Sequence, residues 1–139
     1  MNRIFTLLIV TILLCFSACA TANLIIPENL SPAELIQRAQ EASDRNRYNQ
    51  ALQYYQALLE RNSFNIGLVC EAEYEIAFIH YKQKKYSLAR EEFNALLERY
   101  NGEDVEDLPL HFKLLSNKVL EKLEEKEKKG FSKRKSSLS

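Results

Sequence analysis

A 16-residue segment occurs twice in this chain, with a period of 38 residues. The first copy starts at Arg47 and reads RYNQALQYYQALLERN, and the second starts at Lys85 and reads KYSLAREEFNALLERY. Seven positions are identical in the two copies: Tyr48/Tyr86, Ala51/Ala89, Ala57/Ala95, Leu58/Leu96, Leu59/Leu97, Glu60/Glu98 and Arg61/Arg99. A recurrence at such a spacing is typical of stacked supersecondary units, none of which can bury its apolar face alone. The repeat therefore favours an architecture used for binding rather than for catalysis.

The composition favours helix and gives no electrostatic reason to expect a nucleic-acid partner. The 139 residues leave room for one domain. They include only three glycines and three prolines and no tryptophan. Nineteen basic residues balance nineteen acidic ones, so no excess of positive charge is present to hold phosphates. We expect an all-α domain that does not bind nucleic acid.

The N-terminal residues have the layout of an export signal. Arg3 precedes an uncharged apolar run from Ile4 to Phe16, which is too short to cross a bilayer comfortably as a permanent helix. Residues 1–18 are therefore predicted to be a signal peptide, and the protein is predicted to leave the cytoplasm.

The sequence FSAC that ends at Cys19 resembles the lipobox of bacterial lipoproteins, in which the cysteine is acylated and becomes the new N-terminus. Phe16 departs from the leucine that is usual at its position. Cleavage after Ala20 or Ala22 is the alternative, because both sites satisfy the small-x-small rule. We predict lipidation of Cys19, with residues 19–30 as a tether between the membrane and the folded domain.

Few other residues suggest site chemistry. If Cys19 is acylated and the leader removed, Cys70 is left as a single thiol, which can form neither an internal disulfide nor a zinc site. His80 and His111 belong to no catalytic or metal-binding motif, and we predict a half-buried, hydrogen-bonded His80 and a surface His111. The acidic segment 103–107 lacks the glycine and the spaced ligands of a calcium loop. No catalytic residue, metal or cofactor is expected.

Helix signals divide residues 31–129 into five helices. Ser31, Pro32 and Glu34 combine an N-cap hydroxyl, a proline at the first helical position and a capping-box carboxylate. Four helices are predicted over 32–46, 48–62, 67–83 and 86–100. Two-residue turns make the helices of each pair antiparallel, so the unit is a helical hairpin that is used twice.

The fifth helix is predicted to close the stack. Its apolar residues recur at steps of four, three, four and four and form one stripe: Leu108, Phe112, Leu115, Val119 and Leu123. A terminal helix with one wet face is what a repeat stack needs at its end. Residues 130–139 are predicted to be a disordered basic tail.

The two hairpins resemble tetratricopeptide repeats, in which small residues lie where helices cross closely and an aromatic residue follows in the second helix. The matching residues are Ala39, Ala51 and Tyr55 in the first hairpin, and Ala77, Ala89 and Phe93 in the second. The chain departs from the pattern in its missing early aromatic, its missing final proline and a period four residues longer than the common 34. The resemblance implies two stacked tetratricopeptide-type hairpins plus a C-terminal capping helix, an α-solenoid.

The longer link between the hairpins, the helix ending ALLERN and the lipobox are together similar to the outer-membrane assembly lipoproteins of the BamD type. The resemblance covers residues 31–100, and because family members carry more repeats this chain would be a shortened relative. It implies a non-enzymatic outer-membrane lipoprotein, facing the periplasm, that acts as a protein-binding scaffold in the assembly of outer-membrane β-barrel proteins. Its implied partners are the β-barrel insertion pore subunit and unfolded outer-membrane proteins. The alternative is a general periplasmic adaptor that organises cell-envelope proteins.

The partner-binding groove is predicted on the concave face, which the first helix of each hairpin lines. The inward-facing residues of the helix over 67–83 are Glu71, Tyr74, Phe78, Tyr81 and Lys82. Their three aromatic rings would form a rigid platform for apolar side chains of a partner. Alternatively, the fifth helix covers them.

Overall fold

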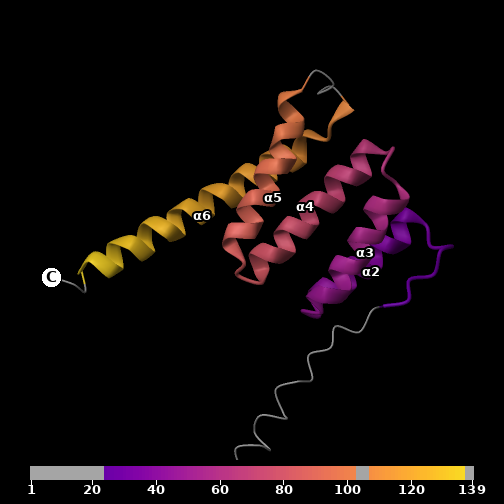
Figure 1. The fold of residues 1–139 in the computed structure, drawn as a ribbon, viewed down its shortest axis with the longest axis horizontal. Coiled ribbons are helices and arrows are strands. Elements are labelled where there is room, and N and C mark those ends of the chain that lie inside the picture. The colour runs from indigo at the N-terminus through magenta and orange to yellow at the C-terminus, as the bar shows by residue number, and fades with distance from the viewer. Residues whose placement is uncertain (1–23, 103–106, 137–139) are drawn as a thin grey trace, which may run out of the picture.

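The computed structural model describes residues 24–102 and 107–136, and these residues are entirely helical or irregular, without strands (Figure 1). The elements are α2 (Pro32–Asp44), α3 (Tyr48–Arg61), α4 (Ile66–Lys82), α5 (Tyr86–Glu98), the 3-10 turn η2 (Arg99–Asn101) and α6 (Leu110–Ser136). The all-α prediction is confirmed, and the bounds of the first four helices agree with the predicted ones within two residues. The predicted signal peptide and the predicted lipidation site, Cys19, lie outside the described residues. None of the described helices is both long and apolar enough to cross a membrane.

The two hairpins turn in the same way, although their turn sequences differ. Asn46 and Lys84, one period apart, both take the left-handed conformation, with φ of 57° and 62°. In each turn the N–H of the residue that follows donates to a carbonyl in the last turn of the preceding helix. In the first hairpin the Arg47 N–H donates to the Ala42 carbonyl at 2.8 Å, and in the second the residue 85 N–H donates to the residue 80 carbonyl at 3.0 Å. Asparagine adopts this conformation readily, whereas lysine does so at a cost of roughly 1–2 kcal/mol, so the packing of the second hairpin must hold its turn in place.

The helices pack in chain order. α2 pairs with α3, α4 with α5, and α4 joins the two hairpins by packing against α3 (Figure 1). α6 packs against α5 and also touches α4, so it takes the place that the first helix of a third hairpin would have. The side chains of Ala39, Ala51, Ala77 and Ala89, which the repeat pattern places at close crossings, are all fully buried. The architecture is therefore a short helical-repeat solenoid with one additional helix at its end.

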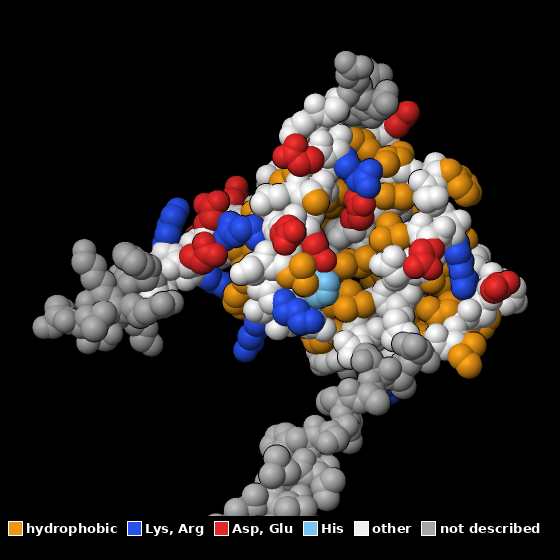
Figure 2. Space-filling view, viewed as in Figure 1, with side chains coloured by type: hydrophobic (Ala, Val, Ile, Leu, Met, Phe, Trp, Pro, Cys, Tyr) orange, Lys and Arg blue, Asp and Glu red, His pale blue; other side chains and the backbone are white. Residues whose placement is uncertain are grey.

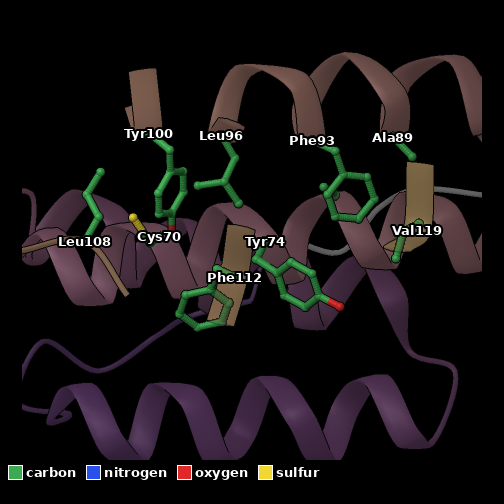
Figure 3. Close-up of a cluster of buried hydrophobic side chains, with 10 residues drawn as sticks. Cys70, Tyr74, Ala89, Phe93, Leu96, Tyr100, Leu108, Phe112 and Val119 are labelled. Carbon is green, nitrogen blue, oxygen red and sulfur yellow. The ribbon is translucent and has the colours of Figure 1, made fainter. Parts of the chain in front are cut away.

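Two clusters of buried side chains hold the stack together. The first lies mainly within the first hairpin and is composed largely of small and aliphatic residues: Leu35, Ala39, Ala42, Ala51, Tyr55, Ala57, Leu58, Ala72 and Ile79. The second joins α4, α5, η2 and α6 and is rich in aromatic residues (Figure 3): Cys70, Tyr74, Ala77, Ala89, Phe93, Leu96, Tyr100, Leu108, Phe112 and Val119. Each large side chain buried in this way contributes about 1.5–3 kcal/mol of hydrophobic stabilisation.

The buried face of α6 differs from the predicted stripe by one residue. Ser116 is fully buried, whereas Leu115 is 40% exposed. The prediction counted the helical phase from Leu108, but α6 begins only at Leu110. Leu108 is buried from the segment before the helix, where the Tyr100 hydroxyl donates a 2.8 Å hydrogen bond to the Pro109 carbonyl.

The two ends of the domain are more ordered than the sequence suggests. α6 continues through Gly130 to Ser136, where a disordered tail over 130–139 is predicted. Two glutamate–lysine pairs, 124–128 and 125–129, support this part of the helix, and one interior glycine costs only about 1 kcal/mol. Residues 137–139 lie outside the described residues.

The described part of the predicted tether lies along α3. The Leu24 N–H donates to Gln53 Oε1 at 2.7 Å, and the Arg61 guanidinium donates to the carbonyls of Pro27 and Ile26 at 2.9 and 3.2 Å. Ile26 also packs against the first cluster. Residues 24–30, the described part of the predicted tether, therefore pack on the folded body.

Candidate functional site

The aromatic strip predicted to line the groove begins inside the core. Tyr74 is only 7% exposed, and its ring centroid lies 5.7 Å from that of Phe93 and 5.5 Å from that of Phe112 (Figure 3). Phe78 and Tyr81 continue the stack, with successive centroids 5.9 Å apart, and both are half-buried. Because α6 supplies Phe112 against the first ring, the start of the strip is covered by the fifth helix.

The other end of the strip is covered by a cation. Lys126 of α6 places its Nζ 4.7 Å from the Tyr81 ring centroid and 4.9 Å from that of Tyr86. The same amine donates to the Tyr81 hydroxyl at 3.1 Å. An ammonium between two aromatic rings is stabilised by the ring quadrupoles. Of the three rings, Phe78 alone is left without a contact from α6 among the described aromatic and cation contacts.

Lys82 lies at the end of the inner face of α4 that is next to the first hairpin. Its amine lies 5.3 Å from the Phe78 ring centroid and 5.6 Å from that of Tyr48, and it donates a hydrogen bond to the Ser43 hydroxyl on α2. Lys82 thus links α4 to both helices of the first hairpin and is not a free charge for a partner.

Two carboxylates remain on the inner face of α4, and the sequence prediction included only one of them. Glu71 and Glu75 are one helical turn apart and both are half-buried. Within the described residues neither has a hydrogen bond or an ion pair. Burial raises the pKa of both carboxyl groups; Lys82 opposes the increase at Glu75, and His111 opposes it at Glu71. The i, i+4 spacing of the two glutamates was the signal that could have identified Glu75.

A buried phenol accompanies these carboxylates. Tyr55 on α3 is 1% exposed, and its hydroxyl has no hydrogen-bond partner among the described atoms. Burial raises the pKa of Tyr55, and the nearby negative charges of Glu75, Glu71 and Asp44 raise it further. Buried polar atoms almost always have a hydrogen-bond partner. An unpaired hydroxyl close to two carboxylates therefore shows that this face has hydrogen-bonding capacity that the described residues do not use.

The opposite face of α4 forms the floor of a hollow of about 590 Å³ between α3 and α5. Apolar side chains gather on this side of the molecule among charged ones (Figure 2). The lining residues are Gln56, Leu59, Glu73, Ile76, Glu92, Ala95, Leu96, Glu98 and Arg99. On a helical wheel, residues 73, 76 and 80 lie opposite residues 71, 75, 78 and 82, so α4 presents one face to each surface.

Polar contacts fix the rim of the hollow. The Arg99 guanidinium donates to both carboxylate oxygens of Glu73, at 2.7 and 2.6 Å. His80 Nδ1 lies 2.7 Å from a carboxylate oxygen of Glu92, and the His80 side chain is 12% exposed. The prediction of a half-buried, hydrogen-bonded His80 is confirmed. His111 is exposed, as predicted.

Cys70 is fully buried, and burial raises the pKa of its thiol. A buried thiol of this kind packs as a small hydrophobic residue. Among the residues that the structure describes, no group of three or more histidine, cysteine or acidic side chains is arranged to hold a metal ion.

Comparison with known proteins gives little further information. No family model matches the chain, and no solved structure matches it. An uncharacterized protein of Treponema pallidum (strain Nichols) is 37% identical over 84 residues, which are 60% of this chain and 34% of that protein. The matched part of this chain thus spans about a third of the length of that relative.

Proposed function

We propose that this chain is a non-enzymatic protein-binding scaffold, anchored in the outer membrane through a lipid on Cys19 and facing the periplasm. In this proposal it takes part in the assembly of outer-membrane β-barrel proteins, as the BamD-type lipoproteins do. The proposal combines the lipobox-like leader with the helical-repeat fold. The observation that carries the binding role is the inner face of α4, where two half-buried carboxylates lie near an unpaired buried hydroxyl.

Such a face is suited to a basic side chain of a protein partner. A lysine or arginine placed between Glu71 and Glu75 forms charge-assisted hydrogen bonds, which are stronger than neutral ones. In the free protein the same carboxylates are partly desolvated and form no described ion pair, which costs free energy. Lys82 and His111 offset this cost only in part, because the pKa of both carboxyl groups stays raised. A bound cation removes that cost, so the gain in binding free energy is specific to partners that carry a positive charge. Phe78, next to the carboxylates, offers apolar contact to the rest of the partner segment.

The lipid has a separate role in the proposal. Two acyl chains hold a protein at a membrane far more firmly than one, and the anchored scaffold then searches a surface rather than a volume. The segment 24–30 lies along α3, so in this proposal only residues 20–23 separate the lipid from the folded body.

Affinity isolation after chemical cross-linking tests the role in barrel assembly. The wild-type chain should co-purify with the barrel-inserting pore subunit, and Glu75→Lys should lose it because like charges then meet at the inner face. Glu91→Lys, an exposed position on α5, is the matched control and should retain the partner. Co-purification of wild-type protein with peptidoglycan-binding or division proteins only would contradict barrel assembly and support the envelope-adaptor alternative.

Substitution of Cys19 tests the anchor independently. Cys19→Ala should release the protein from the membrane fraction and remove the mass of the acyl groups. Cys15→Ala, within the predicted leader, should leave both properties unchanged. If Cys19→Ala protein stays membrane-bound with no mass change beyond the substitution, the anchor is not at this residue.

A further inference from the structure

The hollow between α3, α4 and α5 combines an apolar floor with an acidic rim. Leu59, Ile76 and Leu96 line its floor, and its rim carries three carboxylates and a single guanidinium. Its volume of about 590 Å³ lies within the range of specific binding sites. These features select an apolar group that is flanked by positive charge.

The rim carboxylates are positioned in advance and still have capacity to bind. Arg99 holds Glu73, His80 holds Glu92, and the Asn101 amide donates to Glu98 at 3.3 Å. An ionised carboxylate has about four acceptor sites, so each of these groups can accept further hydrogen bonds from a cation. Because these contacts already order the carboxylate side chains, less conformational entropy is lost when a cation binds them.

The distal end of α6 carries the complementary features. Its last described contact with the body is the 2.8 Å ion pair between Glu127 and Arg90. Beyond it the side chains of Lys128 and Lys129 are 80% and 81% exposed, and a Cβ added at Gly130 would meet no atom within 4 Å. The sequence from 128 to 135, KKGFSKRK, contains five basic residues and no acidic one, with Phe131 near its centre.

This segment cannot reach the hollow of its own chain while α6 is helical. α6 lies on the far side of α5 from α3, and its distal end extends away from the body, towards the C-terminus in Figure 1. A helix rises about 1.5 Å per residue and does not fold back on itself, so the segment is presented to other molecules.

We propose that residues 128–136 of one copy dock into the α3–α4–α5 hollow of a second copy, with Phe131 on the apolar floor and the basic residues facing the acidic rim. The docking segment and the hollow are different surfaces, so the contact is heterologous. Such a contact links copies into open rows, unless two copies exchange their segments and form a closed dimer. This self-association goes beyond the proposed function and depends neither on barrel assembly nor on the lipid.

Peptide binding tests the contact directly. A fluorescently labelled synthetic peptide of residues 124–139 is titrated into the full chain in mild detergent, and anisotropy is recorded. We expect saturable binding that weakens as salt is added, because exposed charges are screened. Phe131→Ala in the peptide should weaken binding about tenfold or more, as expected for the loss of a buried aromatic side chain.

A matched pair of variants tests the acceptor surface. Glu98→Lys places a cation on the rim and should weaken peptide binding, whereas Glu60→Lys changes the equivalent residue of the first repeat, outside the lining of the hollow, and should not. Absence of binding by the wild-type peptide, equal binding by the Phe131→Ala peptide, or equal effects of Glu98→Lys and Glu60→Lys would each overturn the proposal.

Disulfide trapping tests the same contact between whole chains. A Phe131→Cys chain mixed with an Ala95→Cys chain should form a cross-linked dimer, because Ala95 is exposed in the hollow. The control is a mixture with Phe64→Cys, at an exposed position that does not line the hollow. Equal yields in the two mixtures, or no cross-link in either, would show that the segment does not enter the hollow.

Discussion

The two hairpins share a 16-residue motif but bury different kinds of side chain. The first hairpin has a cluster dominated by alanine and aliphatic residues, with Tyr55 as its one fully enclosed aromatic ring. The second has Phe93 at the same repeat position, within a cluster that also contains aromatic residues of α4, η2 and α6. The difference follows from the neighbours, since a long helix covers the second hairpin and a short irregular segment lies on the first. The repeat thus determines the path of the helices, and the non-repeated segments determine what each hairpin must bury.

The shared arginine shows the same effect in a polar residue. Arg61 ends α3 and donates to backbone carbonyls of residues 26 and 27, whereas Arg99 follows α5 and pairs with Glu73. An identical side chain at the same repeat position thus fastens the N-terminal segment in one hairpin and fixes the rim of the hollow in the other.

Of the changes that test this difference between the hairpins, removal of α6 should have the largest effect on stability and solubility. Deletion of residues 108–139 exposes the aromatic cluster at Phe93 and Leu96, and we expect the truncated protein to aggregate. Size-exclusion chromatography with light scattering measures this. Deletion of residues 128–139 removes only the part without described contacts to the body and should leave the thermal midpoint unchanged. A monomer with a normal midpoint after the longer deletion would show that α6 is not the cap.

Exchange of the equivalent aromatic residues should have opposite effects in the two hairpins. Tyr55→Phe removes a buried hydroxyl without a described partner and should raise the free energy of unfolding by about 1 kcal/mol. Phe93→Tyr adds a hydroxyl to a fully buried apolar site and should lower it by about 1–3 kcal/mol. Chemical denaturation measures both changes. If Tyr55→Phe destabilises the protein, its hydroxyl has a partner outside the described residues.

Much of this fold could be predicted from the sequence because local signals decide it. The capping residues at Ser31, the two-residue turns and the spacing of the small residues are encoded within a few positions of one another, and they gave helix bounds within two residues. The stripe on α6 was misassigned because its phase depends on where the helix starts. Just before that start, the Pro109 carbonyl accepts a hydrogen bond from the Tyr100 hydroxyl, a contact that no sequence pattern indicates.

The candidate site was harder to predict because it depends on what covers α4. The spacing of Tyr74, Phe78 and Tyr81 correctly places them on one face, but only tertiary packing shows that Phe112 and Lys126 cover its two ends. The hollow on the opposite face was missed altogether. Its lining comes from three helices, and no single periodicity in the sequence brings them together.

Removal of each repeat arginine should have smaller effects. Arg61→Ala should cost about 1 kcal/mol and release residues 24–30 from α3, because it breaks two charge-assisted hydrogen bonds to backbone carbonyls. Arg99→Ala should cost less, since the Arg99 side chain is exposed and surface pairs contribute roughly 0–1 kcal/mol. Amide hydrogen exchange of residues 24–30 distinguishes the two variants. Faster exchange there in Arg99→Ala, rather than in Arg61→Ala, would contradict the difference between the hairpins.

The smallest predicted effect concerns the dependence of stability on pH. Burial raises the pKa of Glu71 and Glu75 in the folded state above the ordinary value of 4.5, so between these values the folded protein binds more protons than the unfolded chain. Stability attributable to these groups is therefore greatest in acid and is lost as pH rises through the raised pKa values. Glu75→Gln should remove the part due to Glu75, and the thermal midpoint of the variant should exceed that of the wild type more at pH 7 than at pH 4.5. Glu91→Gln, exposed on α5, should not change the profile. A constant difference between Glu75→Gln and wild type across this range would mean that Glu75 is compensated by a cation at neutral pH, and that the inner face of α4 is as fully satisfied as the aromatic core between α4, α5 and α6.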